Sequence, residues 1–266
     1  MKVLACYNIK GGVGKTATAV NLAWLSARDG FRTLVWDLDP QGASSFYFRI
    51  RPEVAAGATG LMRGVLNLTQ AIKGTDYENL DLLPADFSYR NMDLLLDSED
   101  QSRRRLSKLL SPLDEEYDYL ILDCPPGITL LSENVFTASD ALLVPTIPTT
   151  LSLRTLDQLL RFCRKEGLDD FGILPFFTMV DVRKSLHRRI VEELPLKIPG
   201  MLTGYIPYAS DIEQMGVHRS AVGCYAAHGR SARAYEELWW EIRTRLEWIG
   251  NRGAGIGLTG TEDKRA

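Results

Sequence analysis

A glycine-rich segment near the start of the chain carries the residue types that bind phosphate groups. It follows an apolar run and leads into a helical pattern, as a phosphate-binding loop requires. Its glycines allow the backbone to approach the phosphates, and the N–H groups at the helix start point at the anion. Lys15 can neutralise the β and γ phosphates, and the Thr16 hydroxyl can coordinate Mg²⁺. The loop comprises Lys10, Gly11, Gly12, Val13, Gly14, Lys15 and Thr16.

Two carboxylates follow predicted strands and could complete a metal site. Asp123 ends an apolar run, where a carboxylate can orient a water molecule bound to Mg²⁺. Asp39 follows another run and is fixed by the proline after it, so it could face the γ phosphate, and Asp37 would support the site from nearby. Alone, an acid at a strand end is more often a helix cap or turn residue. Because these carboxylates occur together with a phosphate loop, we predict that Thr16, Asp39 and Asp123 form a metal site.

The phosphate loop departs in one respect from the common pattern G-x-x-x-x-G-K-[ST]. Ile9 stands where that pattern has its first glycine, and an additional lysine, Lys10, follows it. Together with Lys15, this residue places two cations beside one triphosphate. If Lys10 cannot contact its own nucleotide, it can reach across an interface to a partner's nucleotide and stabilise transition-state charge, as an arginine finger does. The alternative is a glycine-rich turn with surface lysines, which the seven constrained positions disfavour.

Short apolar runs with helical patterns between them must position these groups. The runs are 3–7, 33–36, 80–83, 119–122, 141–144, 173–180 and 205–206. Near-continuous apolarity is typical of strands that are buried on both faces of a sheet. Between the first two runs, apolar residues recur at helical spacing, and Gly30 is the predicted C-cap. This alternation predicts an α/β fold: a doubly wound, mostly parallel twisted sheet with helices on both faces, whose ligands bind beyond the carboxyl ends of the strands.

The composition limits the class of protein. The chain has 266 residues, of which 45% are hydrophobic and 24% are charged, which is enough for one large core or two small ones. No apolar run reaches the roughly 20 residues that a bilayer crossing needs, and the first residues carry neither a basic lead nor a cleavage site. The four scattered cysteines suggest neither a disulfide framework nor a metal cluster, so we expect a cytoplasmic protein. Because the net charge is −3, nucleic-acid binding would have to come from a local basic patch.

The body of the chain contains no repeat and no linker, so we predict a single domain over residues 1–249. Residues 250–266 are rich in Gly, Thr and charge, and they predict a flexible tail. Before the tail, residues 234–249 predict a closing helix. Its apolar residues are Trp239, Trp240, Ile242, Leu246 and Trp248. The glutamates of this helix would be repelled by anionic lipid, which favours docking on the sheet over insertion into a membrane surface.

Three motifs in order carry a resemblance to a known family. Besides the phosphate loop, they are Asp-Leu-Asp-Pro-Gln-Gly at 37–42 and Asp-Tyr-Leu-Ile-Leu-Asp-Cys-Pro-Pro-Gly at 118–127. Over residues 1–246 the chain resembles the ParA/MinD family of deviant Walker ATPases, and ParA-type members most of all. Members dimerise around two ATP molecules with Mg²⁺. In the family the position of Asp39 orients the attacking water, so the resemblance implies that Lys10, Lys15 and Asp39 are the catalytic residues.

The resemblance also implies a function. ParA-type members hydrolyse ATP slowly, form ATP-dependent homodimers, bind DNA non-specifically, and position a plasmid, a chromosome or a protein assembly. A cargo-linked protein stimulates hydrolysis, and the ATP-bound form would lie on the nucleoid in the cytoplasm. One residue departs from the pattern, since Ala17 stands where the family usually has a hydroxyl residue that contacts the α phosphate. With only the backbone N–H of Ala17 available, we expect lower nucleotide affinity or a lower rate.

Two later segments resemble the far end of the family's nucleotide pocket. Residues 176–183 resemble a segment that follows a late strand and leads to a helix. Residues 206–209 resemble a segment whose proline flanks adenine, which implies that Pro207 contacts the base. Ala209 stands where relatives often have Asn, so a base-recognising side chain would be missing. In isolation, an Ile-Pro pair would indicate only a strand terminus.

Cations gather just after the late strand. They are Arg183, Lys184, Arg188 and Arg189. Leu186, Ile190 and Leu194 recur at helical spacing, so one face of this helix could pack while another offers its cations to DNA phosphates. The alternative is a solvated basic face that is balanced by Glu192 and Glu193.

The resemblance favours DNA contact by this helix, with Arg219 nearby. Tyr208 and Asp211 count against it, because they occupy places where relatives often have arginines. A second cluster lies on another predicted helix and is equally consistent with a solvated surface. Its members are Arg103, Arg104, Arg105 and Lys108.

Alternatives from other classes remain open. A MinD-like regulator of a membrane surface would need a terminal basic amphipathic helix, whereas this sequence ends in a glycine-rich stretch, so no membrane partner is expected. An ATP-dependent metabolic ligase on a related fold would phosphorylate a carboxylate. Lys10 argues against it, because a lysine that acts in trans has no obvious task there. A reductase with a bridging iron–sulfur cluster is disfavoured, since Cys124 has no suitably spaced partner.

Overall fold

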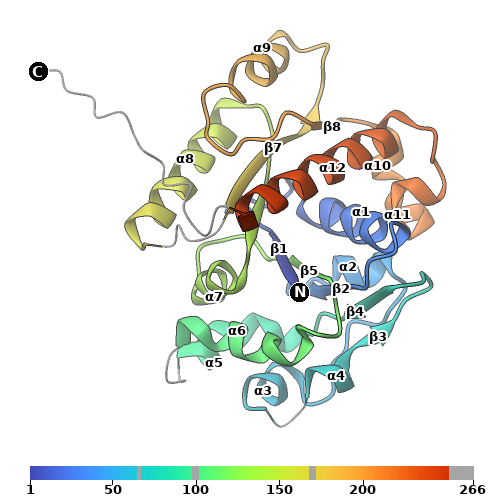
Figure 1. Cartoon of the computed structure of the whole chain (residues 1–266), viewed down its shortest axis with the longest axis vertical. Helices are drawn as coiled ribbons and strands as arrows, with labels where there is room; N and C mark the ends of the chain where they lie inside the picture. Colours follow the sequence, from blue (N-terminus) through green and yellow to red (C-terminus); the bar gives the residue numbers. More distant parts are fainter. Residues whose placement is uncertain (65–66, 98–101, 168–171, 252–266) are drawn as a thin grey trace, which may run out of the picture.

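The computed structural model describes residues 1–64, 67–97, 102–167 and 172–251. Their strands form one eight-stranded sheet in the order β3-β4-β2-β5-β1-β6-β7-β8 (Figure 1). Every neighbouring pair is parallel except β3 with β4. The strands are β1 (Lys2–Cys6), β2 (Thr33–Asp37), β3 (Lys73–Gly74), β4 (Leu80–Leu83), β5 (Tyr119–Asp123), β6 (Ala141–Thr146), β7 (Gly172–Val180) and β8 (Tyr205–Pro207).

This sheet confirms the predicted fold class. Each of the seven predicted strands is present, and its bounds differ from the prediction by at most two residues. The prediction missed β3, because two exposed residues give no apolar pattern. The parallel strands place their carboxyl ends at one edge of the sheet, where ligands bind in such folds.

Helices cover both faces of the sheet (Figure 1). Those of five or more residues are α1 (Lys15–Arg28), α2 (Ala43–Tyr47), α3 (Gly57–Met62), α5 (Met92–Asp97), α6 (Arg105–Leu110), α7 (Leu130–Ala138), α8 (Thr150–Lys165), α9 (Ser185–Glu193) and α12 (Arg230–Asn251). The four-residue helices are α4 (Leu68–Ala71), α10 (Ser210–Glu213) and α11 (Met215–His218), and the 3₁₀ turns are η1 (Phe87–Asn91), η2 (Ser102–Arg104), η3 (Ser111–Leu113) and η4 (Val222–Cys224).

Alternate residues of the strands feed two apolar cores. In β1, Leu4 and Cys6 belong to the core under α1, α11 and α12, whereas Val3 and Ala5 belong to the core under α3, α5, α6, α7 and α8. A third cluster holds α9 on the same face as α8, where Ile190 packs with Phe177 of β7. The near-continuous apolar character of the strands follows from this burial on both faces.

The helix that follows the phosphate loop ends in a Schellman motif. Asp29 is the C-cap residue, and Gly30 follows it in the left-handed conformation with φ 89°. The N–H of Gly30 donates to the carbonyl of Ala27, and the N–H of Phe31 donates to that of Ser26. Gly30 therefore ends the helix as predicted, but it is the residue after the C-cap and not the C-cap itself.

The closing helix α12 docks on the sheet, as predicted, through one side only. Trp239, Ile242 and Leu246 are buried, but Trp240 and Trp248 are exposed, so the expectation that all of these residues pack was wrong. The helix has large apolar residues on more than one side, which the sequence pattern does not resolve. It runs to Asn251, two residues past the predicted domain boundary, and residues 252–266 of the predicted tail lie outside the described residues.

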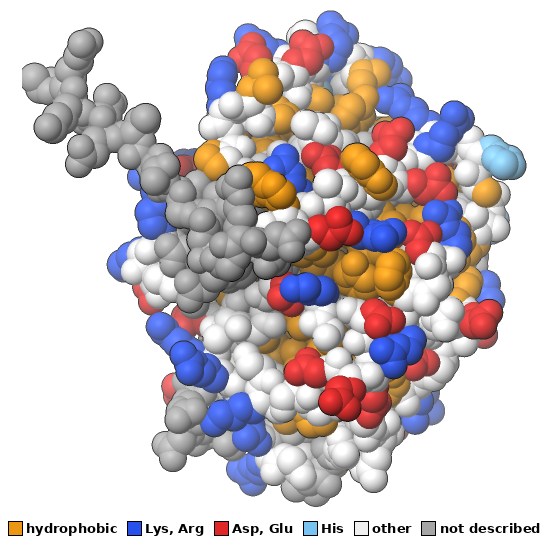
Figure 2. Space-filling view, in the orientation of Figure 1, with side chains coloured by type: hydrophobic (Ala, Val, Ile, Leu, Met, Phe, Trp, Pro, Cys, Tyr) orange, Lys and Arg blue, Asp and Glu red, His pale blue; other side chains and the backbone are white. Residues whose placement is uncertain are grey.

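Surface charge is unevenly distributed. Figure 2 shows acidic and basic side chains interspersed over the middle of the displayed face, and Lys and Arg side chains gathered along its left margin, where Figure 1 places α6 and α8. In the described ranges of the chain, no helix is both long and apolar enough to cross a membrane.

Candidate active site

The phosphate loop connects β1 to α1 through two glycines in the left-handed conformation. Gly12 has φ 70°, and Gly14, which is the N-cap residue of α1, has φ 93°. A Cβ atom is unfavourable in this region, so glycine is required at both turns. Gly11 and Gly12 are exposed at the mouth of the site, and no atom would meet a Cβ at either position within 4 Å. The backbone is therefore open to an incoming anion at the start of a helix.

Two buried side chains that the sequence analysis missed hold this loop. The Asn8 amide donates to the carbonyl of Pro145 at 2.9 Å and accepts from the N–H of Lys10 at 2.9 Å. The Thr178 hydroxyl, on β7, donates to the carbonyl of Val13 at 2.8 Å. Both side chains are 2% exposed. The loop is thus held from two neighbouring strands, β6 and β7.

Lys15 and Lys10 take different positions. Lys15 is 8% exposed, and its Nζ lies 3.4 Å from the carbonyl oxygen of Lys10. The pKa of Lys15 is lowered, because its burial outweighs the opposing effect of the nearby Asp123 and Asp39 carboxylates. The side chain of Lys10 is exposed at the mouth of the loop. One lysine is therefore held inside the site while the other is turned to solvent.

Asp37 and Asp123 lie side by side because β2 pairs in parallel with β5 and places them opposite each other in the register. Both are fully buried. The Ser44 hydroxyl donates to Asp123 Oδ2 at 2.8 Å, and the Ser45 hydroxyl and N–H donate to Asp37 Oδ2 at 2.8 and 2.7 Å. Burial raises the pKa of Asp37 and then the charge of Asp123 raises it further. Burial likewise raises the pKa of Asp123, against the hydroxyls of Ser44 and Thr16, which lower it.

The donor set fits a magnesium ion that is shared with phosphates. Asp123 Oδ1 is buried and has no hydrogen-bond partner, so it can accept from a water molecule bound to the ion. Thr16 lies in the first turn of α1, and its hydroxyl is near enough to Asp123 to lower the pKa of that carboxyl. In the described ranges no group of three or more His, Cys, Asp or Glu residues could hold a metal. Mg²⁺ commonly takes one or two carboxylates together with substrate phosphates, and Thr16 with Asp123 matches that kind of site.

Asp39 lies in the loop between β2 and α2. Its Oδ1 accepts from the N–H of Gln41 at 3.0 Å, which turns the chain after the strand. It is half-buried, and its charge affects both Lys15 and Asp123. The structure therefore brings the predicted residues Lys15, Thr16, Asp39 and Asp123 together. Ser44 and Ser45, which directly follow this loop, were missed, although two hydroxyls after an acidic loop could have signalled the support.

The segments expected around the base lie at the same edge of the sheet. Pro207 is buried at the carboxyl end of β8, and Tyr208 after it is 58% exposed. Residues 176–183 are themselves the end of β7 and the turn into α9, and their Met179 has φ 52° at a bulge in the pairing with β8. Ala17 packs against the core beneath α12. Contact of Pro207 with adenine stays a prediction.

The predicted cations lie on α9 and in the turn before it, and they are partly engaged within the protein. Arg183 forms a bidentate pair with Asp181 at 2.9 and 3.0 Å, and Arg188 donates to the carbonyl of Val182 at 2.8 Å. Lys184 and Arg189 are exposed. The expected apolar stripe is wrong in one member, because Leu186 is 39% exposed. His187 is buried on this helix in place of Leu186, and it accepts a hydrogen bond from the N–H of Asp181.

Arg219 is not brought together with α9. It follows α11, which packs on the opposite face of the sheet, and it stacks on Phe46 at 4.6 Å. Asp211 accepts from the Ser231 hydroxyl at 2.6 Å, which gives it a structural contact. The second predicted cluster is partly internal. Arg103 pairs with Glu133 and Glu166, and Arg105 donates to the carbonyl of Met62.

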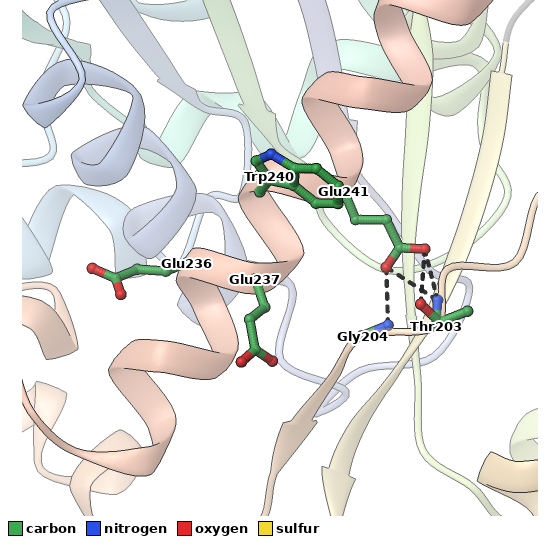
Figure 3. A pocket seen from close by; sticks show the side chains of 6 residues that line it. All are labelled: Thr203, Gly204, Glu236, Glu237, Trp240 and Glu241. Atoms are coloured by element: carbon green, nitrogen blue, oxygen red, sulfur yellow. Dashed lines mark hydrogen bonds between the residues drawn. The ribbon is translucent and has the colours of Figure 1, made fainter.

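A surface hollow of about 590 Å³ lies away from the phosphate loop (Figure 3). It is lined by Thr203, Gly204, Glu236, Glu237, Trp240 and Glu241. Thr203 and Gly204 precede β8, so the hollow is at the amino edge of the sheet, opposite the phosphate loop. Glu241 accepts from the N–H groups of Thr203 and Gly204, at 2.9 Å each, and fixes this turn. The hollow is therefore not the nucleotide site.

Comparisons with known proteins agree with this geometry. Residues 1–167 match the family described as an AAA domain. The chain is 32% identical over 249 residues to the sporulation initiation inhibitor protein Soj of Bacillus subtilis, covering 91% of this chain and 98% of that protein. It is 30% identical over 253 residues to the chromosome-partitioning ATPase Soj of Treponema pallidum, covering 92% and 98%.

Solved structures show the same fold. A putative plasmid partition protein from Borrelia burgdorferi bound to AMPPNP has a TM-score of 0.80 at 22% identity, covering 92% of this chain and 99% of that one. Cobyrinic acid a,c-diamide synthase from Mycobacterium smegmatis, with a bound ATP analog and magnesium, has a TM-score of 0.77 at 27% identity, covering 96% and 98%. From its three motifs, its sheet and its relatives, the chain belongs to the ParA/MinD family of P-loop ATPases.

Proposed function

We propose that this protein is a ParA-type ATPase that dimerises around ATP and Mg²⁺, binds DNA non-specifically and positions a cargo. The observation that carries the proposal is the pair of lysines, with Lys15 held inside the loop and Lys10 exposed at its mouth. Lys15 and the N–H groups at the start of α1 hold the β and γ phosphates. Lys10 serves the nucleotide of the second subunit.

Two carboxylates, Asp123 and Asp39, take part in binding Mg²⁺ and in orienting the attacking water. Asp123 and Thr16 hold Mg²⁺, which neutralises phosphate charge when it is bound. Asp39 orients the attacking water from its loop. Hydrolysis is slow until a cargo-linked protein stimulates it, and the ATP-bound dimer lies on DNA in the cytoplasm. One relative that is named for chromosome partitioning, the Soj ATPase of Treponema pallidum, supports this proposal, and the similarity extends over nearly the whole length of that protein.

The dimer is tested by Asp39→Ala, which removes the water-orienting carboxylate and leaves the phosphate loop intact. We expect this variant to bind ATP and to elute as a stable dimer in size-exclusion chromatography with Mg²⁺ and ATP. Lys15→Ala is the matched control, and it should elute as a monomer under the same conditions. An Asp39→Ala protein that binds ATP and stays monomeric would contradict the proposal.

A metabolic ligase is the second candidate, because the similarity to cobyrinic acid a,c-diamide synthase covers 96% of this chain. The two functions differ in what accelerates ATP turnover. A partition ATPase responds to DNA together with a protein partner, whereas a ligase requires a small carboxylate substrate. ATP turnover should therefore be measured with and without duplex DNA, and with a panel of carboxylic acids. Turnover that depends on a carboxylate and ignores DNA favours the ligase.

A further inference from the structure

Helix α8, not α9, is the more positively charged of the two neighbouring helices on this face of the sheet. Over Thr150–Lys165 it has four cations against one carboxylate, Asp157. Over Ser185–Glu193, α9 has two arginines against two glutamates. The cations of α8 are all exposed, and they are Arg154, Arg161, Arg164 and Lys165. On a protein whose net charge is −3, this helix is a local concentration of positive charge.

Three of the four cations of α8 lie along a single outer line. The buried side of the helix is formed by Ser152, Leu156, Leu159 and Cys163. At about 100° per residue, Arg154, Arg161 and Lys165 all project from the opposite side, with Gln158 between them. At about 1.5 Å per residue, the line from Arg154 to Lys165 is roughly 16 Å long. Asp157 pairs with Arg161 at 2.9 Å, but an exposed pair of this kind is weak and exchanges readily with another anion.

This line adjoins the predicted basic helix and a further cation. Leu153 of α8 packs against the apolar cluster that contains Phe177 of β7 and Ile190 of α9, so the two helices cover the same face of the sheet. At the other end of α8, the pairing of Arg103 with Glu166 brings η2 and the exposed Arg104 alongside. The left margin of Figure 2, where Lys and Arg side chains gather, includes this surface.

We propose that the outer line of α8 binds the phosphate backbone of double-stranded DNA, as a second contact surface beside α9. The inference rests on the proposed function, in which the protein binds DNA. A duplex carries one charge per about 1.7 Å, so a stretch as long as this line presents roughly ten phosphates. Cations spaced along a helix can pair with them without reading bases, which gives sequence-independent binding. A membrane fits less well, because no apolar side chain lies on the line between Arg154 and Lys165.

The test measures how DNA retention depends on salt for wild-type protein and three double variants, each with Mg²⁺ and ATP. Arg154→Ala with Lys165→Ala removes the two ends of the α8 line, and Arg188→Ala with Arg189→Ala removes the pair on α9. Arg63→Ala with Lys73→Ala is the matched control, since it removes two exposed cations elsewhere and changes the net charge equally. We expect the α8 variant to lower the slope of log Kd against log salt by about 1.8 for each bound subunit, or roughly 0.9 for each lost phosphate contact.

The outcomes separate this inference from the function on which it rests. A lower slope for the α8 variant with an unchanged control supports the inference. An α8 variant with the wild-type slope overturns it and leaves DNA binding by α9 intact. If wild-type protein with Mg²⁺ and ATP is not retained on DNA even at 50 mM salt, DNA binding itself is overturned. Binding of phosphatidylglycerol vesicles that depends on the α8 cations, without DNA retention, would replace DNA by a membrane surface.

Discussion

The hydrogen bond from Thr178 to the phosphate loop gives the sharpest prediction of stability. Thr178→Val keeps the shape of the side chain and removes the hydroxyl, which leaves the buried carbonyl of Val13 with one donor fewer. An unsatisfied buried acceptor costs about 1–3 kcal/mol. With a urea m-value of about 3 kcal/mol per M, a loss of 2 kcal/mol lowers the unfolding midpoint by roughly 0.7 M. The affinity for ATP should fall as well, because the loop is no longer held in its binding shape.

A matched variant separates the hydrogen bond from packing. Thr178→Ser keeps the hydroxyl and loses only the methyl group, which lies 3.9 Å from the place that a Cβ atom on Gly14 would take. Loss of one methyl group costs about 1 kcal/mol, so the serine variant should lie between wild type and Thr178→Val. Urea unfolding without nucleotide and calorimetric titration with ATP measure the two effects. If Thr178→Val unfolds at the wild-type urea concentration and binds ATP equally well, the hydrogen bond does not hold the loop.

Three further predictions concern the same site. Because burial raises the pKa of Asp37 to about 8, the folded protein binds more protons than the unfolded chain, and its stability falls as pH rises from about 4 to 8. Asp37→Asn should therefore raise Tm at pH 8 more than at pH 5, and an equal change at both would contradict this. Gly14→Ala should cost about 1–2 kcal/mol in urea unfolding because φ is 93°, whereas Gly11→Ala should cost little; equal effects would refute the conformational argument. Lys10→Ala should lower ATP turnover at least about tenfold with little change in Kd, and unchanged turnover would remove its role in trans.

The fold was predictable because its signals are local. Strands buried on both faces appear as apolar runs, and the phosphate loop requires glycines where the backbone is left-handed, at Gly12 and Gly14. The closeness of Asp37 and Asp123 could not be predicted in the same way. It arises because β2 and β5 are neighbours in the sheet, although they are far apart along the chain.

The supports of the site were missed for a similar reason. Thr178 is 165 residues from the carbonyl that it holds, and Asn8 acts through β6. The basic surface was only partly predicted, because the outer line of α8 arises from helical spacing, which brings Arg154 into line with Arg161 and Lys165 although they are separated in the sequence. The run of cations in the sequence predicted that Arg183 and Arg188 contact DNA. Their contacts within the protein, with Asp181 and with the carbonyl of Val182, depend on the turn before α9 and could not be predicted.

Calorimetric titration of the wild-type protein with ATP and Mg²⁺, next to Lys15→Ala, tests the central claim most directly. If the loop grips a triphosphate, the wild type should release heat that saturates at one ATP per chain, and Lys15→Ala should give none. A wild-type titration without binding heat at several temperatures, or an equal affinity in Lys15→Ala, would contradict the account.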